Sequence, residues 1–184
     1  MIALVRHTFD ANKAVKENHW GEYLKFIGTE LAEKTLVIIG MGNIGTRVAL
    51  RARAFEMDIF VSDPYIPESH VTALGGKWVG LDELLRESDV VTIHCPLTPE
   101  TRGMIDERRL ALMKTSAYLI NAARGGIVNE DALCRALKQR KIAGAALDVV
   151  EDEPPGKNHP LFQLDNVVLT PHIGALTFEA SKRG

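Results

Sequence analysis

The chain has 184 residues, of which 46% are hydrophobic and 25% charged, proportions typical of a globular domain. Its 22 Lys and Arg residues against 24 Asp and Glu residues give a formal net charge of −2, which excludes the basic excess of a nucleic-acid-binding protein. No apolar run reaches the length of a membrane span, the first residues lack a secretory-signal pattern, and two cysteines are too few for a disulfide scaffold. We therefore expect a cytoplasmic protein that has neither nucleic acid nor a membrane as a partner.

The first 30 residues precede any predicted strand. Residues 1–20 are helix-like and polar on one side, so this helix either docks on the domain that follows or arrives from another domain. Trp20, Tyr23 and Phe26 come next, and they either pack on the side of the domain or form an oligomer contact, since aromatic residues are enriched in interface cores. We predict a linker helix and interface segment over 1–30 and a Rossmann core over 31–184.

Seven short runs predict β-strands, and most are apolar throughout rather than alternating. Such runs are typical of strands buried on both faces of a parallel sheet. The predicted strands are 35–40, 58–63, 77–80, 89–95, 117–122, 142–148 and 166–170, and helices are predicted between them over 43–55, 81–87 and 132–140. Because strands and helices alternate, the pattern predicts an α/β fold, a doubly wound Rossmann-type parallel sheet of about seven strands with helices on both faces.

A glycine-rich turn links the first predicted strand to the first predicted core helix. The segment Gly-Met-Gly-Asn-Ile-Gly over residues 40–45 fits the pattern G-x-G-x-x-G in the context that supports it. Gly40 permits the tight turn, Gly42 lets the backbone approach a pyrophosphate, and Gly45 lets helix and strand pack closely. The start of the helix offers free N–H groups to phosphates, so the turn predicts a dinucleotide site.

An acidic residue follows at the spacing that such a site requires. Asp63 ends the second predicted strand, 18 positions after Gly45. Its carboxylate would accept hydrogen bonds from both ribose hydroxyls and would repel a 2′-phosphate, which favours NAD over NADP. Pro64 stands where an NADP site could carry an arginine. The competing interpretation is a glycine turn with an Asp that caps a loop.

Three polar residues follow the fifth, sixth and seventh predicted strands. They are Arg124, Glu153 and His172, and the carboxyl ends of parallel strands share the edge where doubly wound folds bind ligands. Each alone is typical of a surface or structural residue. Together they suit reduction of a ketone, because His donates a proton near neutral pH, a carboxylate orients the imidazole, and Arg binds a substrate carboxylate. We predict these three as catalytic residues.

Six motifs in order resemble the D-isomer-specific 2-hydroxyacid dehydrogenase family, specifically its NAD-binding domain. They are VIIGMGNIG at 37–45, SDPY at 62–65, HCPLTPETRGMI at 94–105, NAARGGIVNEDAL at 121–133, ALDVVEDEPP at 146–155 and TPHIGALTFEA at 170–180. The last motif is most similar to phosphoglycerate dehydrogenase-like members. The resemblance covers nearly the whole chain.

The resemblance implies roles residue by residue. Arg124 would bind the substrate, His172 would be the acid/base, and Glu153 would be its partner. The implied cofactor-binding residues are Gly40, Gly42, Asn43, Ile44, Gly45, Asp63, Cys95, Pro96, Thr101, Ala122, Ala123, Arg124, Asp148, His172 and Gly174. Among these, Asn43 and Ile44 would lie at the pyrophosphate, Asp63 at the ribose, Cys95 and Pro96 near the adenine, Ala122 and Ala123 near the nicotinamide, and Asp148 at its carboxamide.

The resemblance also implies an activity. The parent protein would be an NAD-dependent dehydrogenase that transfers a hydride between NAD(H) and a D-2-hydroxy acid or 2-keto acid of phosphoglycerate, hydroxypyruvate or glyoxylate type, and would be a homodimer. The substrate domain of the family is absent from this chain, so we expect the isolated domain to be weak or inactive. The alternative is an NAD(H)-sensing binding module that resembles the C-terminal-binding protein corepressors.

Other reactive side chains receive structural interpretations. His94 and Cys95 are not expected to form a metal pair, because no further ligand lies at metal-site spacing, and we predict no metal site. Cys134 falls on the apolar face of its predicted helix, so we expect it in the protein core. His159 has no visible partner in the sequence, so we expect it at the surface.

Overall fold

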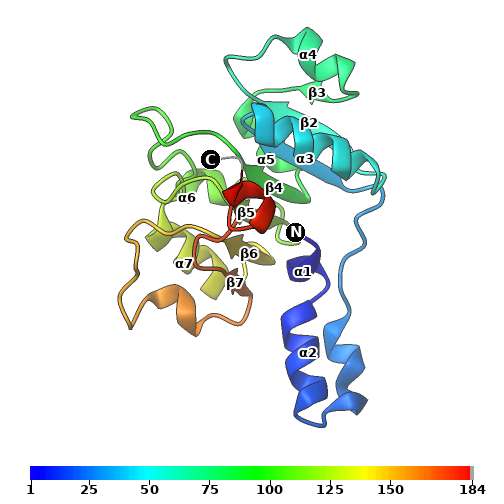
Figure 1. The fold of residues 1–184 in the computed structure, drawn as a ribbon, viewed down its shortest axis with the longest axis vertical. Coiled ribbons are helices and arrows are strands. Elements are labelled where there is room, and N and C mark those ends of the chain that lie inside the picture. The colour runs from blue at the N-terminus through cyan, green and yellow to red at the C-terminus, as the bar shows by residue number, and fades with distance from the viewer. Residues whose placement is uncertain (183–184) are drawn as a thin grey trace.

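A computed structural model describes residues 1–182 of the chain, while residues 183–184, the last two of the predicted core, lie outside the described residues. The described residues form a parallel sheet of seven strands in the order β3-β2-β1-β4-β5-β6-β7 (Figure 1). The strands are β1 Thr35–Ile39, β2 Asp58–Ser62, β3 Lys77–Trp78, β4 Val90–Ile93, β5 Tyr118–Asn121, β6 Gly144–Leu147 and β7 Val167–Leu169. The predicted doubly wound α/β fold is confirmed, and the strand order reverses between β1 and β4.

Helices cover both faces of this sheet. They are α1 Ile2–Val5, α2 Thr8–Lys16, α3 Asn43–Arg53, α4 Glu68–Ala73, α5 Leu81–Glu87, α6 Glu107–Leu110, α7 Glu130–Lys138 and α8 Phe178–Ser181, with the 3-10 helices η1 Trp20–Phe26 and η2 Pro160–Gln163. Successive residues of β1 point to opposite faces. Val37 and Ile39 join a buried cluster with α5 and α7, whereas Leu36 and Ile38 join one with α1 and α3. Burial on both faces explains why the strands are continuously apolar.

The predicted elements agree with the observed ones to within a few residues. The helix predicted over 81–87 is α5, and the helix predicted over 43–55 is α3, which ends at Arg53. The short helices α4 and α6 were not predicted, because four to six residues show too few turns for a periodic pattern. In the part of the chain that the structure describes, no helix is both long and apolar enough to cross a membrane.

The N-terminal segment departs from the prediction of one helix over 1–20. The backbone of His7 turns into the left-handed region, with φ of 49°, and separates α1 from α2. Leu4 and Val5 of α1 are buried in the core, whereas α2 and η1 lie side by side in an arm that extends away from the sheet (Figure 1). Trp20 and Tyr23 on this arm are 75% and 68% exposed, so the alternative that they pack on the domain is wrong for these two residues. Phe26 is half-buried and lines a cavity together with Leu4 and Tyr118 of the domain.

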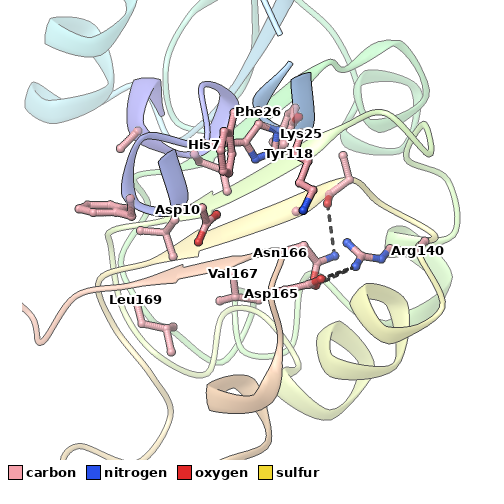
Figure 2. A pocket seen from close by; sticks show the side chains of 16 residues that line it. His7, Asp10, Lys25, Phe26, Tyr118, Arg140, Asp165, Asn166, Val167 and Leu169 are labelled. Atoms are coloured by element: carbon pink, nitrogen blue, oxygen red, sulfur yellow. Dashed lines mark hydrogen bonds and ion pairs between the residues drawn. The ribbon is translucent and has the colours of Figure 1, made fainter. Parts of the chain in front are cut away.

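A cavity of about 500 Å³ lies where the N-terminal helices meet the strands β5, β6 and β7 (Figure 2). Some of its polar side chains are engaged with one another or with the backbone. Arg140 pairs with Asp165 at 2.7 Å, and the amide of Asn166 donates to the carbonyl oxygen of Ala143 at 3.2 Å. These bonds join the segment that follows α7 to the segment before β7, and the cavity lies between the arm and the domain.

Candidate functional site

The glycine-rich turn between β1 and α3 contains glycines that packing requires and one glycine that borders open space. A Cβ on Gly40, whose φ is +92°, would lie 2.7 Å from the backbone nitrogen of Cys95, and a Cβ on Gly45 would lie 2.1 Å from the carbonyl oxygen of Gly40. Both positions therefore exclude a side chain for the sake of the fold itself. A Cβ on Gly42 would meet nothing within 4 Å. The absence of a side chain at Gly42 leaves open space at the start of α3, which suits an incoming pyrophosphate.

Asp63 ties this turn to the end of β2. Its side chain accepts hydrogen bonds from the N–H of Met41 at 2.7 Å and the N–H of Tyr65 at 2.8 Å, and the residue is only 9% exposed. The indole of Trp78 donates to the Asp63 carbonyl oxygen at 3.1 Å and fixes the backbone there. A carboxylate has about four lone-pair sites, so two donors leave capacity for ribose hydroxyls.

A hollow of about 520 Å³ gathers several predicted cofactor residues from three segments of the chain. Its lining residues are Ile44, His94, Cys95, Pro96, Leu97, Ala122, Ala123 and Arg124. Burial lowers the pKa of His94 to about 4 and raises the pKa of the Cys95 thiol, so both groups are uncharged at neutral pH. The hollow is therefore mainly apolar, with Arg124 as its cation.

Asn43 and Thr101 belong to the edges of this site. Asn43 is exposed at the first position of α3, beside the open space at Gly42. The Thr101 hydroxyl donates to the carbonyl oxygen of Pro96 at 2.7 Å and accepts from the N–H of Thr98 at 2.8 Å. The structure thus uses the Thr101 side chain to shape the loop that carries Pro96.

The predicted catalytic residues follow three adjacent strands, β5, β6 and β7, at one edge of the sheet. The Nδ1 atom of His172 lies 2.7 Å from Oε2 of Glu153, and the other oxygen of Glu153 accepts the N–H of Val150 at 3.1 Å. The hydrogen bond with His172 holds the pKa of Glu153 below its usual range. Both side chains are open to solvent, with 47% of His172 and 37% of Glu153 exposed. They line a second hollow of about 500 Å³.

Arg124 approaches this pair through its backbone rather than through its guanidinium. Its guanidinium donates to the carbonyl oxygen of Ala123 at 2.6 Å and lines the first hollow, whereas Glu153 and His172 line the second. The loop after β5 nevertheless touches the loop that carries Glu153, because a Cβ on Gly125 would lie 1.9 Å from the carbonyl oxygen of Val150. The three residues therefore lie at the same edge of the sheet, and the Arg124 side chain faces the hollow that is lined by the predicted cofactor residues.

Asp148 holds the turn that presents His172. The backbone of His172 is left-handed, with φ of 54°, an arrangement that costs about 1 kcal/mol or more for a residue with a side chain. Asp148 accepts hydrogen bonds from the Thr170 hydroxyl at 2.5 Å, the Ile173 N–H at 2.9 Å and the Gly174 N–H at 2.7 Å. Burial alone would raise the pKa of Asp148, but these donors outweigh it and lower the pKa. Sequence reasoning assigned Asp148 and Gly174 to the cofactor and missed this clamp.

The expectation for His159 is wrong, whereas that for Cys134 is confirmed. Cys134 is 7% exposed in the core, as predicted. The His159 side chain is only 16% exposed, and its Nε2 atom lies 3.1 Å from Oε2 of Glu130. This pair joins residues 29 positions apart, and no local motif signals such a contact.

Comparisons with known proteins agree with this geometry. Residues 1–174 match the sequence profile of the family described as D-isomer specific 2-hydroxyacid dehydrogenase, NAD binding domain. The chain is 48% identical over 180 residues to a D-3-phosphoglycerate dehydrogenase of Archaeoglobus fulgidus, covering 98% of this chain and 34% of that protein. It is 46% identical over 186 residues to a glyoxylate reductase of Pyrococcus furiosus, covering 98% of this chain and 55% of that protein.

A solved structure shows the same arrangement. The D-lactate dehydrogenase of Aquifex aeolicus, complexed with NAD and lactic acid, has a TM-score of 0.91 and 38% identity to this chain, with 99% of this chain and 59% of that protein covered. The chain spans about a third of the length of the phosphoglycerate dehydrogenases that it matches. The chain belongs to the D-isomer specific 2-hydroxyacid dehydrogenase family, of which it is an NAD-binding domain.

Proposed function

We propose that the protein to which this chain belongs transfers a hydride between NAD(H) and a 2-keto acid, forming a D-2-hydroxy acid. The observation that carries the proposal is the 2.7 Å contact between His172 and Glu153 at the sheet edge that also bears the glycine-rich turn. A paired imidazole and carboxylate at such an edge are suited to moving a proton. Family membership supports the same reaction class.

The cofactor side of the proposal rests on the residues that would hold NAD. The open space at Gly42 and the free N–H groups of α3 would receive the pyrophosphate, while Asp63 would accept the ribose hydroxyls. Ala122 and Ala123 would border the nicotinamide half, and Cys95 and Pro96 the adenine half. The bound dinucleotide supplies or accepts the hydride.

In the proposed mechanism His172 moves the proton. Because its Nδ1 atom faces Glu153, its Nε2 atom is left to give a proton to the substrate carbonyl oxygen, and to take it back in the reverse reaction. The lowered pKa of Glu153 keeps that carboxylate ionised at neutral pH, so it stabilises the protonated imidazole. The His–Glu pair thus acts as an acid in one direction and as a base in the other.

Arg124 binds the substrate in this mechanism. Its guanidinium has five N–H donors, and one bond to the Ala123 carbonyl oxygen leaves a planar pair of donors for a carboxylate. A carboxylate held there would lie at the same edge of the sheet as the imidazole of His172. The positive charge of Arg124 would also polarise the carbonyl next to that carboxylate.

The test is a substrate screen on the full-length parent. Glyoxylate, hydroxypyruvate and 3-phosphohydroxypyruvate are each supplied with NADH, and loss of NADH absorbance is followed. We expect turnover with at least one of them. Absence of turnover together with NADH-dependent association of a protein partner would overturn the proposal in favour of the binding-module alternative.

We further propose that the protein is a homodimer whose subunits meet at the arm of α2 and η1. Trp20, Tyr23, Leu24 and Ile27 are 65% to 75% exposed, and an apolar patch of this kind is typical of an interface. Sedimentation of the 184-residue chain should give the mass of a dimer, and the double variant Trp20→Ser, Tyr23→Ser should give a monomer. A monomeric wild-type chain at every concentration would contradict this contact.

The proposal places the enzyme in the cytoplasm. Cys95 and Cys134 are free thiols, which suits a reducing compartment. Fractionation of cells that express the full-length protein would test the assignment, and recovery outside the cytoplasmic fraction would contradict it.

A further inference from the structure

A second His–Glu pair lies behind the first. Glu130 opens α7, and His159 directly precedes η2, which follows the Glu153 loop. The side chains of Glu130 and His159 are 15% and 16% exposed, against 37% and 47% for Glu153 and His172. Oε2 of Glu130 lies 3.1 Å from Nε2 of His159, and its Oε1 accepts the N–H of Glu151 at 2.5 Å. Both oxygens of a nearly buried carboxylate are therefore occupied.

Two consecutive amides of the loop after β6 are held by the two glutamates. The N–H of Val150 donates to Oε1 of Glu153, and the N–H of Glu151 donates to Oε1 of Glu130. The same backbone lies directly against Gly125, where a Cβ would meet the Val150 carbonyl oxygen. The loop is thus fixed at one peptide group by Glu130 and Gly125, and Glu153 is anchored to the amide next to it.

His159 fixes the conformation of Glu130. Among residues 1–182, its Nδ1 atom is buried without a hydrogen-bond partner, so the tautomer with the proton on Nε2 avoids an unpaired buried N–H. That proton then points at Glu130. The backbone N–H of His159 donates to the Gly156 carbonyl oxygen at 3.0 Å, and its ring centroid lies 5.5 Å from that of Phe162. The ring has little freedom, and the carboxylate that it faces is correspondingly constrained.

The exposed pair needs such support from outside itself. Ion pairs open to solvent stabilise little, because water screens them and the side chains lose rotamer freedom. Glu153 and His172 are in that situation. Their 2.7 Å contact therefore depends on the backbone that carries them, which Asp148 holds on the His172 side and Glu130 holds on the Glu153 side.

We propose that Glu130 is a positioning residue for the acid–base pair. By accepting the Glu151 N–H it orients the Val150 amide, and that amide keeps Glu153 on Nδ1 of His172. The role assigned to His172 rests on the proposed function, whereas the positional effect of Glu130 does not. Glu130 would thus support Arg124, Glu153 and His172 without touching substrate or cofactor itself.

The experiment compares three variants of the 184-residue chain by NMR. Glu130→Ala removes the acceptor, Glu130→Gln keeps an oxygen that accepts the Glu151 N–H, and Asp131→Ala removes a neighbouring carboxylate from the same helix turn. Hydrogen exchange of the Glu151 amide reports whether its hydrogen bond to Glu130 persists. Long-range proton–nitrogen correlations of the His172 ring report which of its nitrogens carries the proton, and therefore whether Glu153 still accepts from Nδ1.

In Glu130→Ala we expect exchange of the Glu151 amide to accelerate by about tenfold or more, and the His172 proton to shift from Nδ1 toward Nε2. Asp131→Ala should behave like the wild type. Glu130→Gln has a single oxygen for the two donors, the Glu151 N–H and the His159 ring, so its amide exchange and its His172 ring should lie between those of the wild type and Glu130→Ala. Should Glu130→Ala fail to fold, the shorter Glu130→Asp must show the same shift of the His172 proton. An unchanged His172 ring in the folded alanine or aspartate variant overturns the proposal and leaves Glu130 a purely structural residue.

Kinetics of the full-length parent provide an independent readout. Glu130→Ala should lower kcat about tenfold while the KM for the keto acid stays within about twofold, since ground-state binding is untouched. A tenfold rise in KM with an unchanged kcat would contradict the positioning role of Glu130. A parent that turns over no 2-keto acid would overturn the proposed function, and the NMR result would still stand or fall separately.

Discussion

The two halves of the candidate site are built by different means. On the cofactor side the backbone is locked by packing, since Gly40 and Gly45 are buried against other backbone atoms and Asp63 is 9% exposed. On the acid–base side Glu153 and His172 are open to solvent and are held through hydrogen bonds to the loops that carry them. Close packing tolerates no added atom, whereas hydrogen-bonded loops can be weakened one bond at a time. Changes at the closely packed positions of the cofactor side, Gly40 and Gly45, should therefore affect folding, and changes on the acid–base side should affect chemistry.

The largest expected effect lies on the acid–base side. His172→Ala in the full-length parent should lower turnover by about 10²–10⁴-fold, the contribution of a positioned acid/base. NADH affinity should stay nearly unchanged, because the residues that would hold the pyrophosphate and the ribose, Gly42 and Asp63, belong to other elements. Steady-state rates and fluorescence titration with NADH measure the two quantities. Undiminished turnover would remove His172 from the mechanism.

A matched pair of glycine substitutions probes the cofactor side. Gly45→Ala places a methyl group against the Gly40 carbonyl oxygen and should lower the free energy of unfolding by about 3 kcal/mol. Gly42→Ala meets open space, so stability should change by less than about 0.5 kcal/mol, while NADH affinity should fall about tenfold or more. Urea unfolding and NADH titration of the 184-residue chain separate these outcomes. Equal destabilisation by both substitutions would refute the division between the two glycines.

The dependence of stability on pH should report the burial of His94 beside the same turn. Burial lowers the pKa of His94 from 6.5 to about 4 in the folded chain. Between pH 6.5 and pH 4 the imidazole is therefore protonated in the unfolded chain and neutral in the folded chain. The free energy of unfolding should therefore fall as the pH drops from 6.5 to 4, by up to about 3 kcal/mol. His94→Gln should flatten this slope, whereas substitution of the exposed His70 by Gln should leave it. If both variants keep the wild-type dependence of the free energy of unfolding on pH, that dependence arises from groups other than His94.

The smallest expected effect concerns the choice between dinucleotides. The Asp63 carboxylate should make NADH bind about tenfold or more tightly than NADPH, because a 2′-phosphate would meet a like charge. Asp63→Ala should narrow that ratio, although it also removes the acceptor for the Met41 N–H. Fluorescence titrations of wild type and variant with both nucleotides measure it. Equal affinities in the wild type would exclude the discriminating role of Asp63.

Much of the fold and of the candidate site could be predicted because their signals are local. Buried parallel strands are continuously apolar, the glycine spacing lies within six residues, and Arg124, Glu153 and His172 lie in the loops that follow three recognisable strands. Strand ends in a parallel sheet meet at one edge, so the contact between Glu153 and His172 follows from topology. The functional roles of these residues stay predictions.

The features that were missed depend on contacts that no local pattern encodes. Glu130 and His159 are 29 residues apart, and only the folded chain brings them together. The clamp at Asp148 requires the left-handed turn at His172, a conformation that is uncommon for any residue other than glycine and that no local pattern signals here. The break at His7 interrupts a sequence that is helix-like on both sides, so composition alone favoured one continuous helix.

The close approach at Gly125 has a mechanical consequence. With no room for even a methyl group between the two loops, the guanidinium-bearing segment and the acid-bearing segment move as one body. Any lengthening of either loop would shift both the Arg124 guanidinium and the pair of Glu153 and His172. Under the proposed function, substrate range would diversify through elements outside this edge, while a single missing side chain preserves the spacing between the guanidinium and the imidazole–carboxylate pair.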